Sequence, residues 1–205
     1  MLDNIYWTYD ENNVSLSAER KLLIVGQSGS GKTTLARYLC MKYPELFEII
    51  KNCTTRLRRE DDEEEFCYLS VDQFIRAKEN SEFFFARFGA KPLYGYKKVD
   101  YEKIVCSKKI PIFLFRFSGL QHLRNLMKNY YVIFLISELD ESLLRSKDEI
   151  SNSLFLESKF ISEEIKNTIS EFEKNKRKYV IVNNNYKEDF FTQITEVIIK
   201  DIINT

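Results

Sequence analysis

Residues 22–34 read LLIVGQSGSGKTT, and this stretch decides the fold of the chain. An apolar run typical of a buried strand leads into the pattern G-x-x-x-x-G-K-T, and a helical pattern follows over residues 33–43. In such a loop, glycines let the backbone curl so that several N–H groups point at phosphate oxygens. The helix directs the positive end of its dipole at the same anion. The stretch therefore predicts a binding loop for a nucleoside triphosphate.

The side chains of this loop have distinct expected roles. Lys32 would place a point charge at the β- and γ-phosphates, and the hydroxyl of Thr33 would coordinate Mg²⁺. A flexible Gly/Ser loop without a ligand would not explain why Lys-Thr-Thr follows the third glycine. The residues expected to bind the triphosphate are Gly26, Ser28, Gly29, Ser30, Gly31, Lys32, Thr33 and Thr34.

Composition limits the classes of protein to which this chain can belong. The 205 residues suit one domain with an insertion or two small lobes, and 44% of them are apolar, which is typical of a globular protein. With 31 basic and 31 acidic residues the net charge is zero, so neither nucleic acid nor a membrane is an expected partner. The longest apolar run, residues 110–115, is too short to span a bilayer and reads as a buried strand.

Cysteine and histidine usage points to the cytoplasm and away from zinc. The four cysteines form no C-x-x-C pair, so we expect reduced, mostly buried thiols. His122 is the one histidine, and a structural role is favoured for it. The cysteines are Cys40, Cys53, Cys67 and Cys106.

Strands that alternate with helices predict an α/β fold of the P-loop NTPase type, with a parallel sheet and helices on both faces. The expected strands are 21–25, 47–50, 110–115, 131–136 and 179–182, and the expected helices are 33–43, 100–107, 119–128, 161–172 and 190–198, with another beginning near 140.

The middle of the chain has a different character. Short β-like pieces at 66–69 and 83–88 surround a helix that Ser70 would cap, with Gln73 completing a capping box. The acidic run at 60–65 is expected to be a solvated loop. The expected organisation is an N-terminal extension at 1–20, either loose or docked, a P-loop core at 21–52 and 99–205, a small mixed α/β lobe at 53–98, and a lid-like segment at 145–160.

Four motifs follow one another along the chain: GQSGSGKTTL from residue 26, CTTRLRRE from residue 53, YLSVDQF from residue 68 and LYG from residue 93. In this order they resemble motifs of the guanylate kinase family of P-loop nucleoside monophosphate kinases. The resemblance implies that residues 53–98 form the lobe that binds the acceptor monophosphate. It also implies ATP as the donor and Mg²⁺ as the metal. The residues to which it assigns roles are Arg56, Arg59 and Tyr94 on the acceptor phosphate, Arg145 on the transferring phosphate, and Asn183 beside the donor adenine.

The same resemblance exposes departures in the acceptor half of the site. Phe66 stands at the position of a family tyrosine that contacts the acceptor phosphate, and Tyr68 is the candidate substitute. Arg116 stands where the family carries an aspartate near the metal. The positions at which the family reads guanine are Asn52, Phe85 and Tyr96.

Two functions remain open at this point. One is ATP-dependent phosphoryl transfer to a nucleoside monophosphate-like acceptor, or another small phosphate ester, with altered base specificity. The other is a guanylate kinase-like nucleotide-binding module that has lost transfer and interacts with another protein. The chain has neither the D-x-x-G nor the N-K-x-D pattern of a GTPase switch, which makes that class less favoured.

Overall fold

The computed structural model describes residues 6–9, 20–26, 29–60, 65–88, 92–116, 130–136, 167, 170, 179–183 and 190–203. The chain divides into two compact units. The middle unit comprises residues 1–19 and 45–111, and the phosphate-loop unit comprises residues 20–44 and 112–205. Within the described residues, no helix is both long and apolar enough to cross a membrane.

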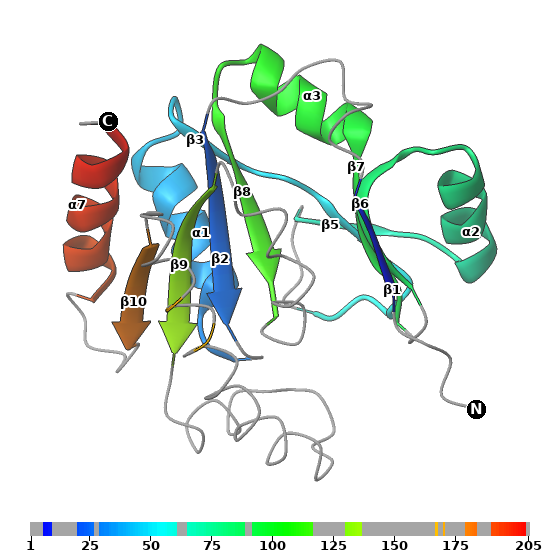
Figure 1. The fold of residues 1–205 in the computed structure, drawn as a ribbon, viewed down its shortest axis with the longest axis horizontal. Coiled ribbons are helices and arrows are strands. Elements are labelled where there is room, and N and C mark those ends of the chain that lie inside the picture. Colours follow the sequence, from blue (N-terminus) through cyan, green and yellow to red (C-terminus); the bar gives the residue numbers. More distant parts are fainter. Residues whose placement is uncertain are drawn as a thin grey trace, which may run out of the picture. The chain divides into compact units, whose positions relative to one another are not determined.

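Parallel strands form the centre of the phosphate-loop unit. Strand β2 pairs in parallel with β8 and β9, and β9 pairs in parallel with β10 (Figure 1). These strands belong to a sheet with the order β10-β9-β2-β8-β3, in which β3 and the first two residues of β8 fall within residues 45–111 of the middle unit. Continuous apolar runs, rather than alternating ones, form these strands because both faces of such a sheet are covered. The strands are β2 (Lys21–Gly26), β3 (Phe47–Ile49), β8 (Ile110–Phe115), β9 (Tyr130–Ile136) and β10 (Tyr179–Asn183).

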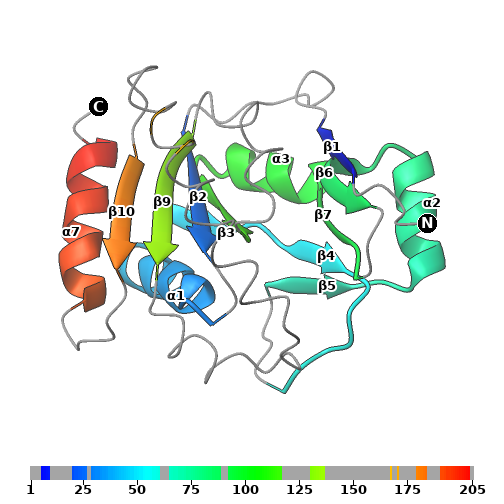
Figure 2. The same cartoon turned by 60° about the horizontal axis from the view of Figure 1, so that its bottom comes forward.

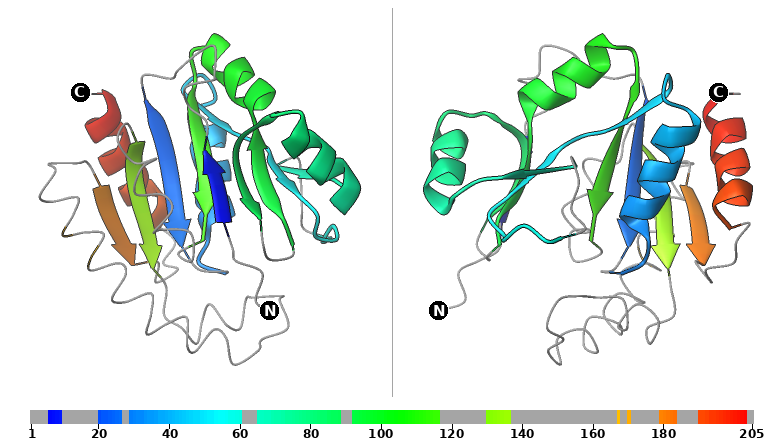
Figure 3. Two further views of the ribbon diagram at one scale, coloured as in Figure 1. Left: turned by 45° about the vertical axis from the view of Figure 1, so that its right-hand side comes forward. Right: turned by 180° about the vertical axis from the view of Figure 1, so that it is seen from behind.

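Helices α1 (Lys32–Lys42) and α7 (Phe190–Ile203) pack beside each other in this unit (Figure 3). The ring of Tyr38 stacks on Phe191 with centroids 5.7 Å apart, and its hydroxyl lies 3.1 Å from Oγ1 of Thr192. Both helices were predicted from their periodicity, and the strands of this sheet were predicted as apolar runs.

The middle unit contains a second sheet, with the order β1-β6-β7-β4-β5 (Figure 2). All neighbouring strands run antiparallel except β4 and β5, which are parallel. Its elements are β1 (Tyr6–Tyr9), β4 (Asn52–Thr54), β5 (Phe66–Tyr68), α2 (Val71–Glu79), β6 (Phe83–Phe88), β7 (Tyr94–Lys97) and α3 (Lys98–Cys106).

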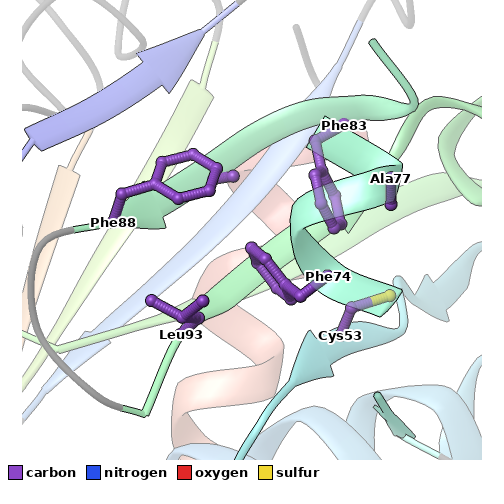
Figure 4. Close-up of a cluster of buried hydrophobic side chains, with 7 residues drawn as sticks. Cys53, Phe74, Ala77, Phe83, Phe88 and Leu93 are labelled. Carbon is purple, nitrogen blue, oxygen red and sulfur yellow. The ribbon is translucent and has the colours of Figure 1, made fainter. Parts of the chain in front are cut away.

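One face of this sheet packs on α2 (Figure 4). Phe74 of the helix stacks on Phe83 with centroids 4.5 Å apart and meets Phe88 edge-on at 5.7 Å. The predicted capping box is confirmed: Ser70 and Gln73 exchange side chain-to-backbone hydrogen bonds of 2.8 and 3.1 Å. The residues predicted to bind the acceptor alternate along the strands with those of this core, so they belong to the opposite face of the sheet.

Several sequence predictions for the middle unit differ from the structure. Leu93-Tyr94-Gly95 resembles a turn motif of the family, but Tyr94 and Gly95 belong to β7, in which Gly95 passes close to Phe83 and Ala86. Residues 6–9 form an edge strand on β6, which settles how this part of the extension is placed. Glu65, expected in a solvated loop, is buried beside β4, where its carbonyl accepts from the Asn52 N–H at 2.9 Å.

The prediction of mostly buried thiols was wrong for Cys106, which is exposed at the end of α3, where the helix turns its last residue to solvent. Cys53 is buried, while Cys40 and Cys67 are half-buried, and all are free thiols. The predictions for the helix at 119–128, including His122, the lid-like segment at 145–160 and most of the helix at 161–172 lie outside the described residues.

Candidate functional site

The phosphate loop owes its shape to glycines. Gly29 has φ 75° and Gly31 has φ 90°, in the left-handed region that other residues adopt only at a cost. Gly26 ends β2, and a Cβ added there would lie 2.6 Å from the Leu135 carbonyl oxygen and would also collide with Oγ of Ser30. The glycines of the motif are therefore required by backbone angle and by close packing.

Helix α1 begins at Lys32, directly after the loop. Gly31 is its N-cap and contributes no side-chain cap, and the first hydrogen bond runs from Leu35 N to the Gly31 carbonyl at 2.9 Å. The first turn contains no acidic residue. The first N–H groups of a helix have no partner within the helix, and a start with a lysine and no acidic residue suits an anion. Thr33 is half-buried and Thr34 is exposed at this end, whereas Gln27 and Ser28 lie outside the described residues.

Other predicted residues follow the carboxyl ends of the parallel strands in this unit. Val25 pairs with Phe115, so Arg116, which is exposed, follows β8 at the level of Gly26. Asn183 is the last residue of β10 and pairs with Ile136. Carboxyl ends of parallel strands meet at one edge of a sheet, where ligands of open α/β folds bind. Arg145 lies outside the described residues.

In the middle unit, two threonine hydroxyls shape the segment that carries Arg56. The Arg56 N–H donates to Oγ1 of Thr54 at 3.2 Å. Oγ1 of Thr55 accepts from the Leu93 N–H at 2.9 Å, and the Thr55 N–H donates to the Leu93 carbonyl at 3.2 Å. These bonds tie Arg56 to the residue that precedes Tyr94. The threonines of the T-T-R motif therefore have a structural role: their hydroxyls hold the backbone next to Arg56 and Tyr94.

The guanidinium of Arg56 lies over aromatic rings of β5. Its carbon Cζ is 4.3 Å from the ring centroid of Phe66 and 5.6 Å from that of Tyr68. Nη1 donates to the Leu57 carbonyl at 2.9 Å. Arg59, the second predicted phosphate contact, is half-buried, while its neighbour Arg58 is exposed.

The residues predicted at the guanine-reading positions form a row across the sheet. Asn52 pairs with Phe66 on one side and Tyr96 on the other, and Tyr96 pairs with Phe85. Asn52 Nδ2 donates to the Tyr96 hydroxyl oxygen at 3.2 Å. Phe85 and Tyr96 are 3% and 2% exposed, with centroids 6.3 Å apart. The row, Phe66–Asn52–Tyr96–Phe85, is aromatic with a single amide and contains no carboxylate.

A second row on the same face comes two residues farther along these strands. Tyr94 pairs with Thr54, which pairs with Tyr68. Because side chains alternate along a strand, residues two apart share a face. Every acceptor-side residue predicted on β4, β5, β6 and β7 therefore belongs to one sheet face.

An ion pair at the base of β7 was not foreseen from the sequence. Lys97 Nζ lies 2.8 Å from Oε2 of Glu82. The hydrogen bond from Lys97, with a second from Asn80, lowers the pKa of Glu82, and the same bond raises the pKa of Lys97. Glu82 and Lys97 lie at the start of β6 and the end of β7, and no local pattern in the sequence joins them.

Each of the two units thus has its own set of candidate ligand-binding residues. The phosphate-loop unit offers glycine backbone, Lys32 and Thr33 to a polyphosphate. The middle unit offers Arg56, Tyr94 and Tyr68 beside an aromatic face, which suits a smaller phosphate ester with an attached ring.

Comparison with known proteins gives a consistent answer. The family model "Guanylate kinase" matches residues 18–201. A guanylate kinase of Mesomycoplasma hyopneumoniae (strain J) is 26% identical over 204 residues, covering 94% of this chain and 100% of the relative. One of Chlamydia felis is 24% identical over 179 residues, covering 85% of each. The crystal structure of guanylate kinase from Anaplasma phagocytophilum matches with a TM-score of 0.56 at 16% identity, covering 91% of this chain and 88% of that one.

Proposed function

Because the chain belongs to the guanylate kinase family, a family of nucleotide kinases, we propose that it transfers a phosphoryl group from ATP to a nucleoside monophosphate-like acceptor with altered base specificity. The observation that carries the altered specificity is the row Phe66–Asn52–Tyr96–Phe85. The proposed setting is the cytoplasm, with small nucleotides rather than nucleic acid as partners.

The donor half supports the nucleotide kinase assignment. The left-handed Gly31 and the uncapped start of α1 suit phosphate oxygens, and Lys32 supplies the charge that balances them. Thr33 is the proposed ligand of Mg²⁺, and Asn183 is the proposed neighbour of the donor base. Mg²⁺ held there would neutralise negative charge on the phosphates.

The proposed mechanism is a direct in-line transfer without a covalent enzyme intermediate. Lys32 stabilises negative charge that develops on the transferred group. Arg56, Arg59 and Tyr94 orient the acceptor phosphate, and Arg145 is the further arginine proposed to act on the transferring group. Little covalent chemistry is required of the protein in such a reaction, so positioning and electrostatic stabilisation supply most of the rate enhancement.

The acceptor half supports a change of base. Hydrogen bonds to the N–H groups of guanine call for a carboxylate or another strong acceptor. Phe85 has none, and its side chain is 3% exposed, as part of a packed aromatic pair with Tyr96. Asn52 is the single amide in the row: its Nδ2 donates to the Tyr96 hydroxyl oxygen, and its Oδ1 is a neutral amide oxygen rather than a carboxylate. GMP is therefore expected to be a poor acceptor, and another base or a non-nucleotide phosphate ester is expected to fit better.

Arg116 favours the second candidate, a nucleotide-binding module that has lost phosphoryl transfer. It is exposed directly beyond β8, at the level of Gly26, where the family resemblance places an aspartate near the metal. A cation there repels a metal ion instead of attracting it, and one charged group at a transfer site is worth about 10²–10³ in rate.

The test is ADP release in the presence of Mg²⁺ and ATP, measured against a panel of ribo- and deoxynucleoside monophosphates. The proposal predicts turnover with an acceptor other than GMP, lost in Lys32→Ala and retained in Lys42→Ala. Lys42 is the matched control because it is exposed at the opposite end of the same helix. Strong GMP turnover would refute the altered specificity, and tight ATP binding with no turnover on any acceptor would favour the binding module.

A further inference from the structure

An arginine–aromatic contact sits where the family resemblance leads one to expect a tyrosine hydroxyl. Phe66 and Tyr68 occupy alternate positions on β5, and their ring centroids are 6.1 Å apart. The guanidinium of Arg56 lies over both rings, closer to Phe66 at 4.3 Å than to Tyr68 at 5.6 Å. Phe66 cannot donate a hydrogen bond, so any contribution it makes to the site comes through its ring.

Hydrogen bonds hold both the guanidinium of Arg56 and the backbone that carries it. Its Nη1 donates to the Leu57 carbonyl at 2.9 Å, and the backbone N–H of Arg56 donates to Oγ1 of Thr54 at 3.2 Å. A cation over a ring within about 6 Å is attracted by the ring quadrupole. When the flat face of a guanidinium lies on a ring, the N–H donors still point outward from the edge of the guanidinium.

We propose that Phe66 is a positioning residue: its ring holds the Arg56 guanidinium so that the N–H edge faces the acceptor phosphate. The proposal rests on the proposed function for the identity of the acceptor. The phosphate contact that a tyrosine hydroxyl would make at position 66 is thereby transferred to an arginine with a reduced choice of rotamers. Ordering the arginine in advance lowers the conformational entropy lost on binding.

Two substitutions of Phe66 separate the effect of the aromatic face from the effect of side-chain size. Phe66→Leu keeps an apolar side chain without a π face, whereas Phe66→Tyr keeps the face. Phe66 is half-buried, and both changes are expected to be tolerated. The probe is inorganic phosphate, titrated at constant ionic strength into the full-length protein. The readout is the side-chain Nε–H resonance of Arg56 in ¹⁵N NMR, assigned by its disappearance in Arg56→Lys.

In the wild-type protein and in Phe66→Tyr, this resonance is expected at the upfield position typical of a proton above an aromatic ring. In Phe66→Leu it moves downfield. The dissociation constant for phosphate rises about threefold to tenfold in Phe66→Leu and stays within about twofold in Phe66→Tyr. The midpoint of thermal unfolding and the affinity for ATP serve as controls for a general structural effect.

Three results would overturn the inference. If the affinity for phosphate is unchanged in Phe66→Leu, the ring does not position Arg56 for phosphate binding. Equal losses in the leucine and tyrosine variants would show that shape rather than the aromatic face is responsible. An Arg56 resonance that does not respond to phosphate would remove the arginine from the phosphate site. Because this titration needs no turnover, its outcome is independent of whether the acceptor panel yields a substrate.

Discussion

Asn52 and Tyr96 are register partners on β4 and β7, and the amide nitrogen of Asn52 donates to the Tyr96 hydroxyl oxygen at 3.2 Å. Among the described residues, Oδ1 of Asn52 is buried and has no hydrogen-bond partner. This pair stands where the family resemblance places guanine readers. The hydrogen bond therefore turns the nitrogen end of the amide toward Tyr96, and the buried oxygen end has no partner among the described residues.

Removing that hydroxyl tests the relationship. Tyr96→Phe keeps the ring, which is 2% exposed, but takes away the partner of Nδ2. We expect a loss of about 1 kcal/mol in the free energy of unfolding, measured by urea denaturation. We also expect a change in the ranking of acceptors, since the amide is free to turn. Tyr94→Phe is the control. An acceptor ranking in Tyr96→Phe identical to that of the wild-type protein would argue against a role for the Asn52 amide in recognition of the base.

Thr55 connects the arginine segment to the strand that carries Tyr94. Thr55→Val removes the oxygen that accepts from the Leu93 N–H at 2.9 Å while keeping the shape of the side chain. A buried N–H left without a partner costs about 1–3 kcal/mol, and the constant KM for the acceptor should rise more than kcat falls. Thr55→Ser restores the oxygen and should restore KM. Equal KM values in the valine and serine variants would contradict this role.

The Glu82–Lys97 pair gives the middle unit a pH-dependent contribution to stability. Its hydrogen bond lowers the pKa of Glu82, so the stabilisation is present above the ordinary glutamate value of about 4.3 and is lost as pH falls through the lower folded value. The raised pKa of Lys97 means that the contribution is present below about 10.4 and is lost as pH rises through the higher folded value.

Glu82→Gln is the corresponding variant. The side chains of Glu82 and Lys97 are 39% and 24% exposed, so solvent screening limits the difference in unfolding free energy to about 0.5–1 kcal/mol at neutral pH. Urea denaturation of both proteins at neutral pH and at pH values below the glutamate range checks this. A difference that grows on acidification would contradict the assignment.

The cysteines should differ in reactivity toward iodoacetamide. Cys106 is exposed, whereas Cys53 is buried, and burial, with a smaller contribution from Cys67, raises the pKa of the Cys53 thiol. Alkylation requires the thiolate, so Cys106 should react first and Cys53 only after unfolding. Peptide mass spectrometry over time follows each site. Labelling of Cys53 as fast as that of Cys106 under native conditions would show that β4 opens readily.

Local patterns predicted much of this molecule. Buried strands such as 110–115 appear as apolar runs, and the α2 capping box needs only Ser70 and Gln73, which are neighbours in the sequence. The glycine-rich loop before α1 was recognised for the same reason, because its glycines, lysine and threonines lie close together in the sequence.

Contacts set by pairing between distant strands were not predictable. Among the described strands, β1 pairs only with β6, which lies far along the chain. The local sequence of β1, with its aromatic residues, therefore did not indicate a strand. The contact of Arg56 with Phe66 depends on the register that pairs Asn52 with Phe66. Gly95 suggested a turn, but its missing side chain serves close packing within β7.

The most direct test of phosphoryl transfer follows the phosphorus atom itself. ATP labelled in its γ-phosphate is incubated with Mg²⁺, the protein and each nucleoside monophosphate, and the products are separated. Our account predicts label in a nucleoside diphosphate formed from an acceptor other than GMP, in equal amount to the ADP released, and none with Lys32→Ala. Label that appears only in inorganic phosphate, or only in GDP, would contradict it.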